Sequence, residues 1–346
     1  MKVQAIGPNG FGVYEVTLQS GNLHWSAALG DADGLLFPGF VDIHFHGAYG
    51  VDAMSAKAGE YADLLSALEK VGYETVYPTT VTASVSDVED FLANLPDHPM
   101  VGGFHLEGPF ISPEYPGAQP PPFIVDYATA PKGWDKVLDD PRLKVITMAP
   151  ERPGALELIK RLSLMGVKVS LGHTNATFEE CQAAHNAGAA HATHTFNAMR
   201  PFHHREAGTV GYVLTSSILT ELIYDRLHVS KNSAKLLFQV KGAEDVIAVS
   251  DSTMATGMPS GSEITMWGLD VVVGEQEVRL KSNGSLAGSA ITLADAFRNL
   301  VGDFGPETAI RACCLNPRRT MNLPEAKVWW RADLHGNLQE RLELQA

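Results

Sequence analysis

Eight apolar segments of strand length recur through the centre of this 346-residue chain, and helix-like segments lie between them. The segments are residues 39–46, 74–79, 101–107, 144–149, 168–173, 189–194, 221–225 and 246–251. Continuous apolar strands that alternate with helices are typical of a parallel sheet covered on both faces. Eight such units predict an α/β fold of the (β/α)8 TIM-like barrel type. The strand pattern alone leaves a doubly wound open sheet as the alternative.

The helix-like segments carry their own start and stop signals. Thr177 and Glu180 have the spacing of a capping box, and Gly188 is placed to end the helix that follows. We therefore expect a helix over residues 178–187. Further helical patterns cover residues 61–71, 88–93, 155–165 and 293–301.

Both ends of the chain differ from the centre, because short alternating segments replace the apolar runs there. The pattern predicts a small β-sandwich-like domain from residues 1–37 plus 320–346, beside a barrel of residues 38–319. A segment rich in Gly, Pro and Ser follows Asp251 and extends to Ser289, where we expect an inserted hairpin.

The composition excludes several classes of partner. Lys and Arg number 26 against 40 Asp and Glu, a net charge of −14, whereas nucleic acids and anionic membranes require a basic face. The three cysteines, Cys181, Cys313 and Cys314, show no metal-binding spacing and predict no disulfide framework. Without a signal-like N-terminus or a long apolar run, we expect a cytoplasmic protein with no membrane partner.

Polar residues gather where the predicted strands end, which is where barrel enzymes place their active sites. Five of the eight segments end in the residues that we take as candidate ligands: His44 and His46, Glu107, His173, His194 and Asp251. A single such residue is usually structural, and Asp251 alone could be a helix cap. Together, the five strand ends indicate a metal centre.

The spacing of these residues favours particular ligands. His44 and His46 are two apart, so both imidazoles point to one face of a strand. His105 lies one layer below Glu107 and is expected to pack, while His191 faces away from His194. Nitrogen and oxygen ligands without a thiolate suit Zn or Fe.

The set offers ligands for one or two ions per subunit. One ion would take His44 and His46, with Asp251 as a further ligand, and another would take His173 and His194. Glu107 would bridge the two ions. Water bound to such an ion loses a proton near neutral pH and becomes a nucleophile.

At these residues the chain resembles the amidohydrolase superfamily and, within it, the family of N-acetylglucosamine-6-phosphate deacetylases. The matching motifs occur in family order: PGFVDIHFHGAYGVD (38–52), HLEGPF (105–110), GHTNAT (172–177), THTFNAM (193–199), RLHV (226–229), SDSTMATG (250–257) and LAGSA (286–290). A strand-3 glutamate is a specific mark, since many relatives use a modified lysine on strand 4, where this chain has none.

The resemblance implies hydrolysis of the acetamido group of N-acetyl-D-glucosamine 6-phosphate to D-glucosamine 6-phosphate and acetate. It makes Glu107, His173 and His194 the ligands of the main ion, and His44 and His46 those of a second. It also makes Asp251 the general base and His228 the group that polarises the carbonyl. Asn197 and Ala198 match phosphate contacts. The segment Leu286, Ala287, Gly288 and Ser289 matches a substrate loop, as does Ala118.

Two further residues depend on the same resemblance. Arg205 matches an arginine that reaches the phosphate from the neighbouring subunit of a homodimer. Arg226 stands where the family commonly has glycine, and it would add a phosphate contact or crowd the sugar. Gln119 replaces a common histidine, and Ala287 replaces a serine. The chain therefore departs from the family at residues that would set sugar identity and phosphate affinity, and not at the metal ligands.

Two rival functions remain open on the sequence. The first is the same deacetylation of another substrate, such as N-acetylgalactosamine 6-phosphate or an unphosphorylated N-acyl amine. The second is a non-catalytic amidohydrolase-like binding protein, which the complete ligand set argues against.

Overall fold

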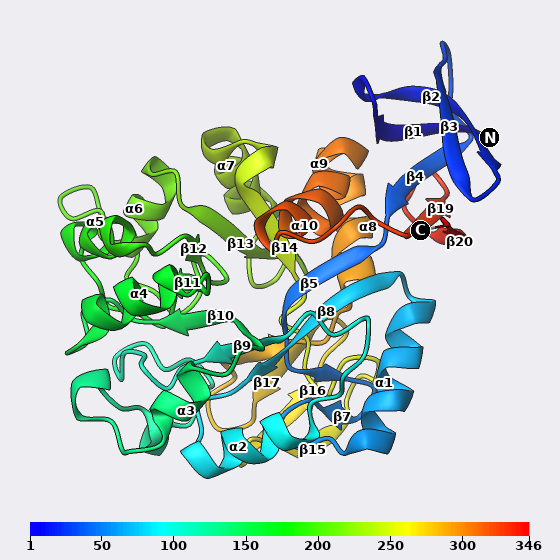
Figure 1. The fold of residues 1–346 in the computed structure, drawn as a ribbon. Helices are drawn as coiled ribbons and strands as arrows, with labels where there is room; N and C mark the ends of the chain where they lie inside the picture. The colour runs from blue at the N-terminus through cyan, green and yellow to red at the C-terminus, as the bar shows by residue number, and fades with distance from the viewer. Residues whose placement is uncertain (346) are drawn as a thin grey trace.

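The structure, a computed structural model that describes residues 1–345, is built around an eight-stranded parallel barrel (Figure 1). Neighbouring strands pair in the order β14-β13-β12-β11-β10-β9-β8-β5. The strands are β5 (Phe40–Phe45), β8 (Tyr73–Thr80), β9 (Phe104–Glu107), β10 (Leu143–Met148), β11 (Lys168–Leu171), β12 (His191–Ala192), β13 (Leu219–Ile223) and β14 (Val246–Val249). All eight predicted strands are present, and several begin or end within one to three residues of the prediction.

The barrel closes where β14 meets β5. The Asp251 amide donates to the His44 carbonyl at 3.0 Å, and the His46 amide donates to the Ser252 carbonyl at 2.9 Å. These bonds rule out the open doubly wound sheet. They also fix the ends of two predicted ligand strands beside each other, so closure of the fold and assembly of the site involve the same backbone.

Helices cover the outside of the barrel (Figure 1). The predicted helix at residues 178–187 is α5 (Phe178–Ala187), and the Thr177–Glu180 capping box is formed. The other helices of at least eight residues are α1 (Ala58–Lys70), α2 (Val85–Asn94), α4 (Ala155–Leu164), α6 (Gly208–Thr215), α7 (Lys231–Lys241) and α8 (Leu293–Phe304). The sequence pattern did not reveal α6 or α7, nor the shorter α3 (Trp134–Leu138), α9 (Pro306–Ile310) and α10 (Asn316–Thr320).

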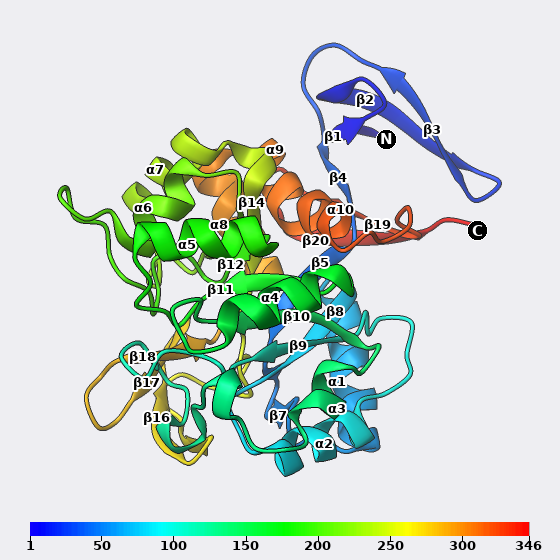
Figure 2. The ribbon, with the colours of Figure 1, turned by 60° about the vertical axis from the view of Figure 1, so that its left-hand side comes forward.

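The two ends of the chain meet in a six-stranded sheet, with β1 to β3 standing away from the barrel (Figure 2). Its strands are β1 (Lys2–Gly7), β2 (Gly10–Gln19), β3 (Asn22–Ala27), β4 (Gly34–Pro38), β19 (Val328–Ala332) and β20 (Leu338–Glu343). This sheet agrees with a small β domain. The proposed boundaries at residues 37 and 320 remain a prediction, and Ala346 lies outside the described residues.

The insertion after Asp251 is larger than the expected hairpin. It forms a four-stranded antiparallel sheet, β15 (Glu263–Met266), β16 (Leu269–Val273), β17 (Glu277–Leu280) and β18 (Leu286–Ser289). A two-residue turn, Trp267–Gly268, joins β15 to β16. A second short hairpin, β6 (Gly47–Ala48) with β7 (Val51–Asp52), follows the metal-ligand strand β5.

Two further expectations concern membranes and disulfides. Within residues 1–345, no helix combines the length and the apolar character that crossing a membrane requires. All three cysteines are buried as free thiols.

Candidate metal centre

Three of the predicted ligands lie just beyond the strands that position them. His173, His194 and Asp251 each follow by two positions the last residue of β11, β12 and β14. Their backbone φ angles are 47°, 28° and 46°, values that residues other than glycine rarely adopt. Such a conformation persists only where the surroundings enforce it, and it is concentrated at functional sites. Here it turns each side chain from the strand end into the barrel mouth.

The four predicted histidine ligands converge on the Glu107 carboxylate. Glu107 Oε1 lies 3.2 Å from His173 Nε2, and 3.3 Å from His194 Nε2 and from His44 Nε2. Glu107 Oε2 lies 3.3 Å from His46 Nε2. The Nε2 atoms are 3.2 Å apart in the His44–His46 pair and 3.1 Å apart in the His173–His194 pair. Glu107 therefore joins two groups of three potential ligands.

The tautomers of these rings follow from the contacts of Nδ1. His46 Nδ1 faces the Thr79 carbonyl at 3.2 Å, and His173 Nδ1 faces the Tyr115 carbonyl at 3.0 Å. A carbonyl oxygen can only accept, so these Nδ1 atoms carry the protons. The Nε2 lone pairs of the neutral rings then point at one another and at a carboxylate.

This donor set fits a transition-metal ion. Facing lone pairs repel unless a proton or a cation lies between them. Ligand atoms about 2.0–2.1 Å from a tetrahedral zinc ion lie roughly 3.3 Å apart, close to the spacings found here. A metal-bound histidine usually donates a hydrogen bond from its other ring nitrogen to a carboxylate or a backbone carbonyl, as His46 and His173 do here. The geometry accommodates a metal in either group.

Burial and charge make the centre attractive to cations. Burial opposes the protonation of His46, yet the Asp251 and Glu107 carboxylates raise the pKa of that imidazole to about 9. Burial also opposes the ionisation of Asp251, but His44 and His46 lower the pKa of its carboxyl to about 2. Without a metal, the histidines would hold protons, and the positive charge of these protons would take the place of the charge of a dication.

Asp251 and His228 flank the ligands at the barrel mouth. Asp251 Oδ1 lies 3.3 Å from His46 Nε2, although Asp251 belongs to neither three-residue group. His228 Nδ1 lies 2.5 Å from Asp225 Oδ2. Burial opposes the charged form of His228, but this hydrogen bond and the Asp225 charge raise the pKa of the imidazole. His228 is thereby prepared to donate from Nε2.

A cavity of about 160 Å³ lies over the predicted metal ligands. Its walls contain several of the predicted substrate contacts, namely Ala118, Asn197, Ala198, His228, Leu286 and Gly288. Ala287 and Ser289 do not line it, because alternate residues of β18 point to opposite faces. Ala287 is buried, and the Ser289 hydroxyl donates to the Ser250 carbonyl at 2.6 Å.

The two predicted phosphate-binding arginines lie outside this cavity. Arg226 Nε donates to Asp303 Oδ2 at 2.7 Å, so an ion pair with helix α8 holds the guanidinium away from the mouth. That Arg226 contacts phosphate or crowds the sugar therefore stays a prediction, which this ion pair does not support. Arg205 is exposed on the loop before α6, beside His204.

Three further residues complete the centre, and the sequence analysis assigned none of them to it. Glu221 Oε2 lies 3.3 Å from His44 Nδ1 and accepts from the His194 amide at 3.3 Å. Gln119 accepts from the Thr82 amide at 2.6 Å, which orients its NH₂ group to donate to Glu107 Oε2 at 2.5 Å. Trp267 lines the cavity from the inserted sheet. The sequence signals were the placement of Glu221 in an apolar strand and the replacement of a common family histidine by Gln119, whereas Trp267 had none.

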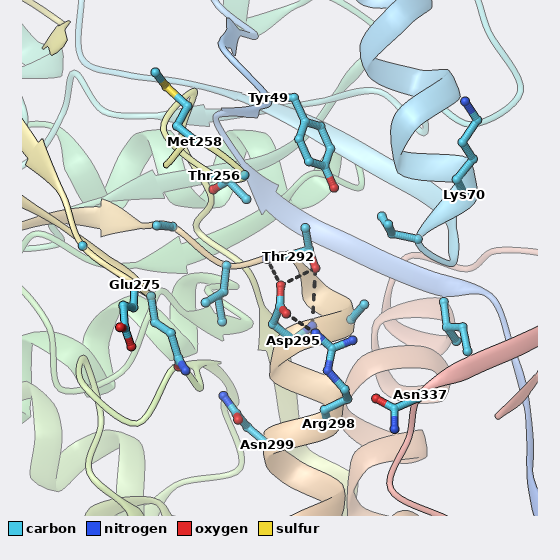
Figure 3. A pocket seen from close by; sticks show the side chains of 18 residues that line it. Tyr49, Lys70, Thr256, Met258, Glu275, Thr292, Asp295, Arg298, Asn299 and Asn337 are labelled. Atoms are coloured by element: carbon cyan, nitrogen blue, oxygen red, sulfur yellow. Dashed lines mark hydrogen bonds and ion pairs between the residues drawn. The ribbon is translucent and has the colours of Figure 1, made fainter. Parts of the chain in front are cut away.

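A larger cavity, of about 710 Å³, is not a candidate for the same chemistry (Figure 3). None of the predicted metal ligands lines it. Its most prominent charged groups are already paired, since Asp295 accepts from the Thr292 hydroxyl at 2.6 Å and forms an ion pair with Arg298.

Comparison with known proteins bears on the site directly. The model of the amidohydrolase family matches residues 35–327. An N-acetylglucosamine-6-phosphate deacetylase of Lysinibacillus sphaericus is 39% identical over 77% of this chain and 70% of the relative. An N-acetylgalactosamine-6-phosphate deacetylase of Escherichia coli O157:H7 is 35% identical over 84% of this chain and 78% of the relative.

A solved structure resembles the whole chain. It is an aspartate-to-alanine mutant of N-acetyl-D-glucosamine-6-phosphate deacetylase from Mycobacterium smegmatis, in complex with N-acetyl-D-glucosamine 6-phosphate. The TM-score is 0.87 at 30% identity, and the match covers 99% of this chain and 97% of the other.

Replacement of the shared carboxylate tests the centre. We predict that Glu107→Gln lowers the metal content of both groups, because the neutral amide removes the one ligand that they share. Elemental analysis of purified protein would measure this, with the exposed Glu114→Gln as the control. Full metal content in Glu107→Gln would contradict the shared role.

Proposed function

The chain belongs to the amidohydrolase family, and from this premise we propose that it hydrolyses the acetamido group of N-acetyl-D-glucosamine 6-phosphate. The products are D-glucosamine 6-phosphate and acetate. The observation that carries the proposal is the convergence of four imidazoles on Glu107 directly below a cavity flanked by Asp251 and His228.

We propose Zn or Fe as the metal, with one or two ions per subunit. The ligands would be Glu107, His173 and His194 for one ion, and His44, His46 and Glu107 for the other. When bound, such an ion lowers the pKa of water and polarises a carbonyl group. Asp251 stands beside the second group as a further possible ligand, although its main role here is proton transfer.

The side chains around the metal ligands divide the proton chemistry between them. Asp251, ionised at neutral pH, accepts a proton from the attacking water and later gives a proton to the leaving amine. The His228 imidazole, oriented by Asp225, donates from Nε2 to the carbonyl oxygen as negative charge develops there. The C–N bond breaks, and acetate leaves.

The substrate would lie across the cavity. Asn197 and Ala198 follow β12 and would bind the phosphate or sugar, with Ala118, Leu286 and Gly288 as further walls. Arg205 is exposed and does not line this cavity. We propose that the protein is a homodimer in which Arg205 reaches the neighbouring site. A guanidinium is suited to bidentate phosphate binding.

A second candidate is the same reaction on N-acetylgalactosamine 6-phosphate, favoured by the similarity to the Escherichia coli relative. The two sugars differ at one hydroxyl, which no metal ligand distinguishes. Release of acetate from a panel of N-acetyl sugars, with and without a 6-phosphate, would separate these candidates. Absence of acetate release from all of them would refute the proposed activity.

We predict that Asp251→Asn lowers kcat by about 10²–10⁴-fold while the metal remains bound. Asparagine cannot take up the proton of the water, but the residue is a member of neither ligand group. Steady-state kinetics and elemental analysis would be measured together, with the exposed Asp270→Asn as control. Near-normal turnover in Asp251→Asn would exclude it as the general base.

The Asp225–His228 pair predicts a pH effect. His228 acts while protonated, below its pKa, and the Asp225 carboxylate raises that pKa. Asp225→Asn should therefore move the alkaline limb of the pH profile of kcat/KM to lower pH. Asparagine retains an oxygen to accept the backbone amides that Asp225 Oδ1 holds. An unchanged alkaline limb would mean that His228 does not act as the proton donor.

We predict that Arg205→Ala reduces kcat/KM for the 6-phosphate sugar far more than for the unphosphorylated sugar, because only the former presents an anion to the guanidinium. Mixing Arg205→Ala with Asp251→Asn subunits should restore some activity if Arg205 serves the neighbouring site. Equal losses on both substrates would argue for an unphosphorylated substrate.

A further inference from the structure

A single tryptophan separates the reaction cavity from a second, larger one. Trp267 lines both the cavity of about 160 Å³ over the metal ligands and an adjoining cavity of about 630 Å³. The larger cavity has a mixed lining, and Met54, Val81, Phe123, Met254 and Met266 supply its apolar part. None of the predicted ligands lines it.

The backbone holds Trp267 in an unfavourable conformation. Trp267 and Gly268 form the two-residue turn between β15 and β16, with φ angles of 55° and 77°. Turns of this kind favour asparagine, aspartate or glycine at both positions, because each needs a positive φ. A bulky residue at the first position is a conformational outlier, and such outliers are concentrated where function requires the side chain.

Contacts across the barrel mouth fix the indole. Its N–H donates to Asp52 Oδ2 at 2.8 Å, and its ring stands edge-on to His46, with centroids 5.2 Å apart. Trp267 is therefore anchored to the hairpin that follows β5. It can neither leave the cavity wall nor turn without the loss of this hydrogen bond.

The strand order indicates which end of the substrate meets Trp267. The sugar-binding candidates Asn197 and Ala198 follow β12, whereas Trp267 contacts residues that follow β5. In the closed order of the barrel, β5 and its neighbour β8 lie across the mouth from β12. The acyl carbon bears the amide nitrogen on one side and the alkyl group on the other. With the sugar toward β12, the alkyl group points toward Trp267.

We propose that Trp267 is a specificity-determining residue that closes the acyl end of the cavity and limits the substrate to a short N-acyl group. This inference rests on the proposed deacetylase function. The reaction is unchanged: the water oxygen bonds to the acyl carbon, the C–N bond breaks, and the amine takes the proton. Only the length of the carboxylic acid released differs.

The wild-type protein provides the first test. Its kcat/KM would be measured on N-acetyl-, N-propionyl- and N-butyryl-glucosamine 6-phosphate, by release of the amine. A closed wall predicts a fall of roughly tenfold or more for each added methylene. Equal activity on the acetyl and butyryl substrates would overturn the proposal, even though it would support the deacylase function. No activity on any of the three would instead refute that function.

Removal of the indole from the cavity wall provides the second test. Trp267→Ala should join the two cavities and raise the butyryl-to-acetyl ratio of kcat/KM by about tenfold or more, since each methylene that enters the apolar space is worth about fourfold in addition to the relief of the clash. Phe123→Ala, which alters the larger cavity but no residue that lines the reaction cavity, should leave the ratio at its wild-type value.

The ratio separates specificity from general damage. A folding defect in Trp267→Ala lowers both activities together, whereas loss of the wall changes their quotient. Circular dichroism would establish that the variant is folded. A folded Trp267→Ala with an unchanged ratio would overturn the proposal. If the alanine variant does not fold, Trp267→Leu offers the same test. The wild-type substrate series is decisive in either case.

Discussion

The buried carboxylate of Glu107 is the group around which the rest of the site is arranged. Four imidazole nitrogens lie within 3.3 Å of one or other of its oxygens, inside a protein core where unpaired polar groups are costly. Such an arrangement is stable only with positive charge at its centre. The tautomers of the rings and the hydrogen bond from Gln119 hold this carboxylate in a position from which it could serve as a ligand of a dication.

The parts of the molecule that could be predicted are those that depend on local periodicity. Apolar runs revealed the eight strands, and the end of each run located His44, His46, Glu107, His173, His194 and Asp251, because parallel strands in a barrel end at one face. Contacts between distant segments could not be predicted. The Arg226–Asp303 pair spans 77 residues, and the left-handed turns after β11, β12 and β14 have no sequence signal in histidine or aspartate.

The net charge of −14 takes on a narrower meaning once the site is known. It still argues against extended polyanions as partners. Several acidic residues, however, are buried at the metal centre, among them Glu107, Glu221, Asp225 and Asp251. The partner imidazoles, and a dication where one binds, would offset these charges locally. The global charge therefore does not oppose a small sugar phosphate, which would be held by short-range contacts rather than by long-range attraction.

Chemistry and specificity come from different parts of this fold. The strands and the turns directly after them position the ligands, and the backbone bonds that close the barrel fix those turns. The walls that would meet the substrate come instead from the loop after β12 and from the inserted sheet that carries Trp267. Loops tolerate change that the barrel cannot, because few core contacts depend on them. Relatives named for different amino sugars can therefore share one barrel. In this chain the residue that would set the length of the acyl group stands on a turn that carries none of the predicted metal ligands.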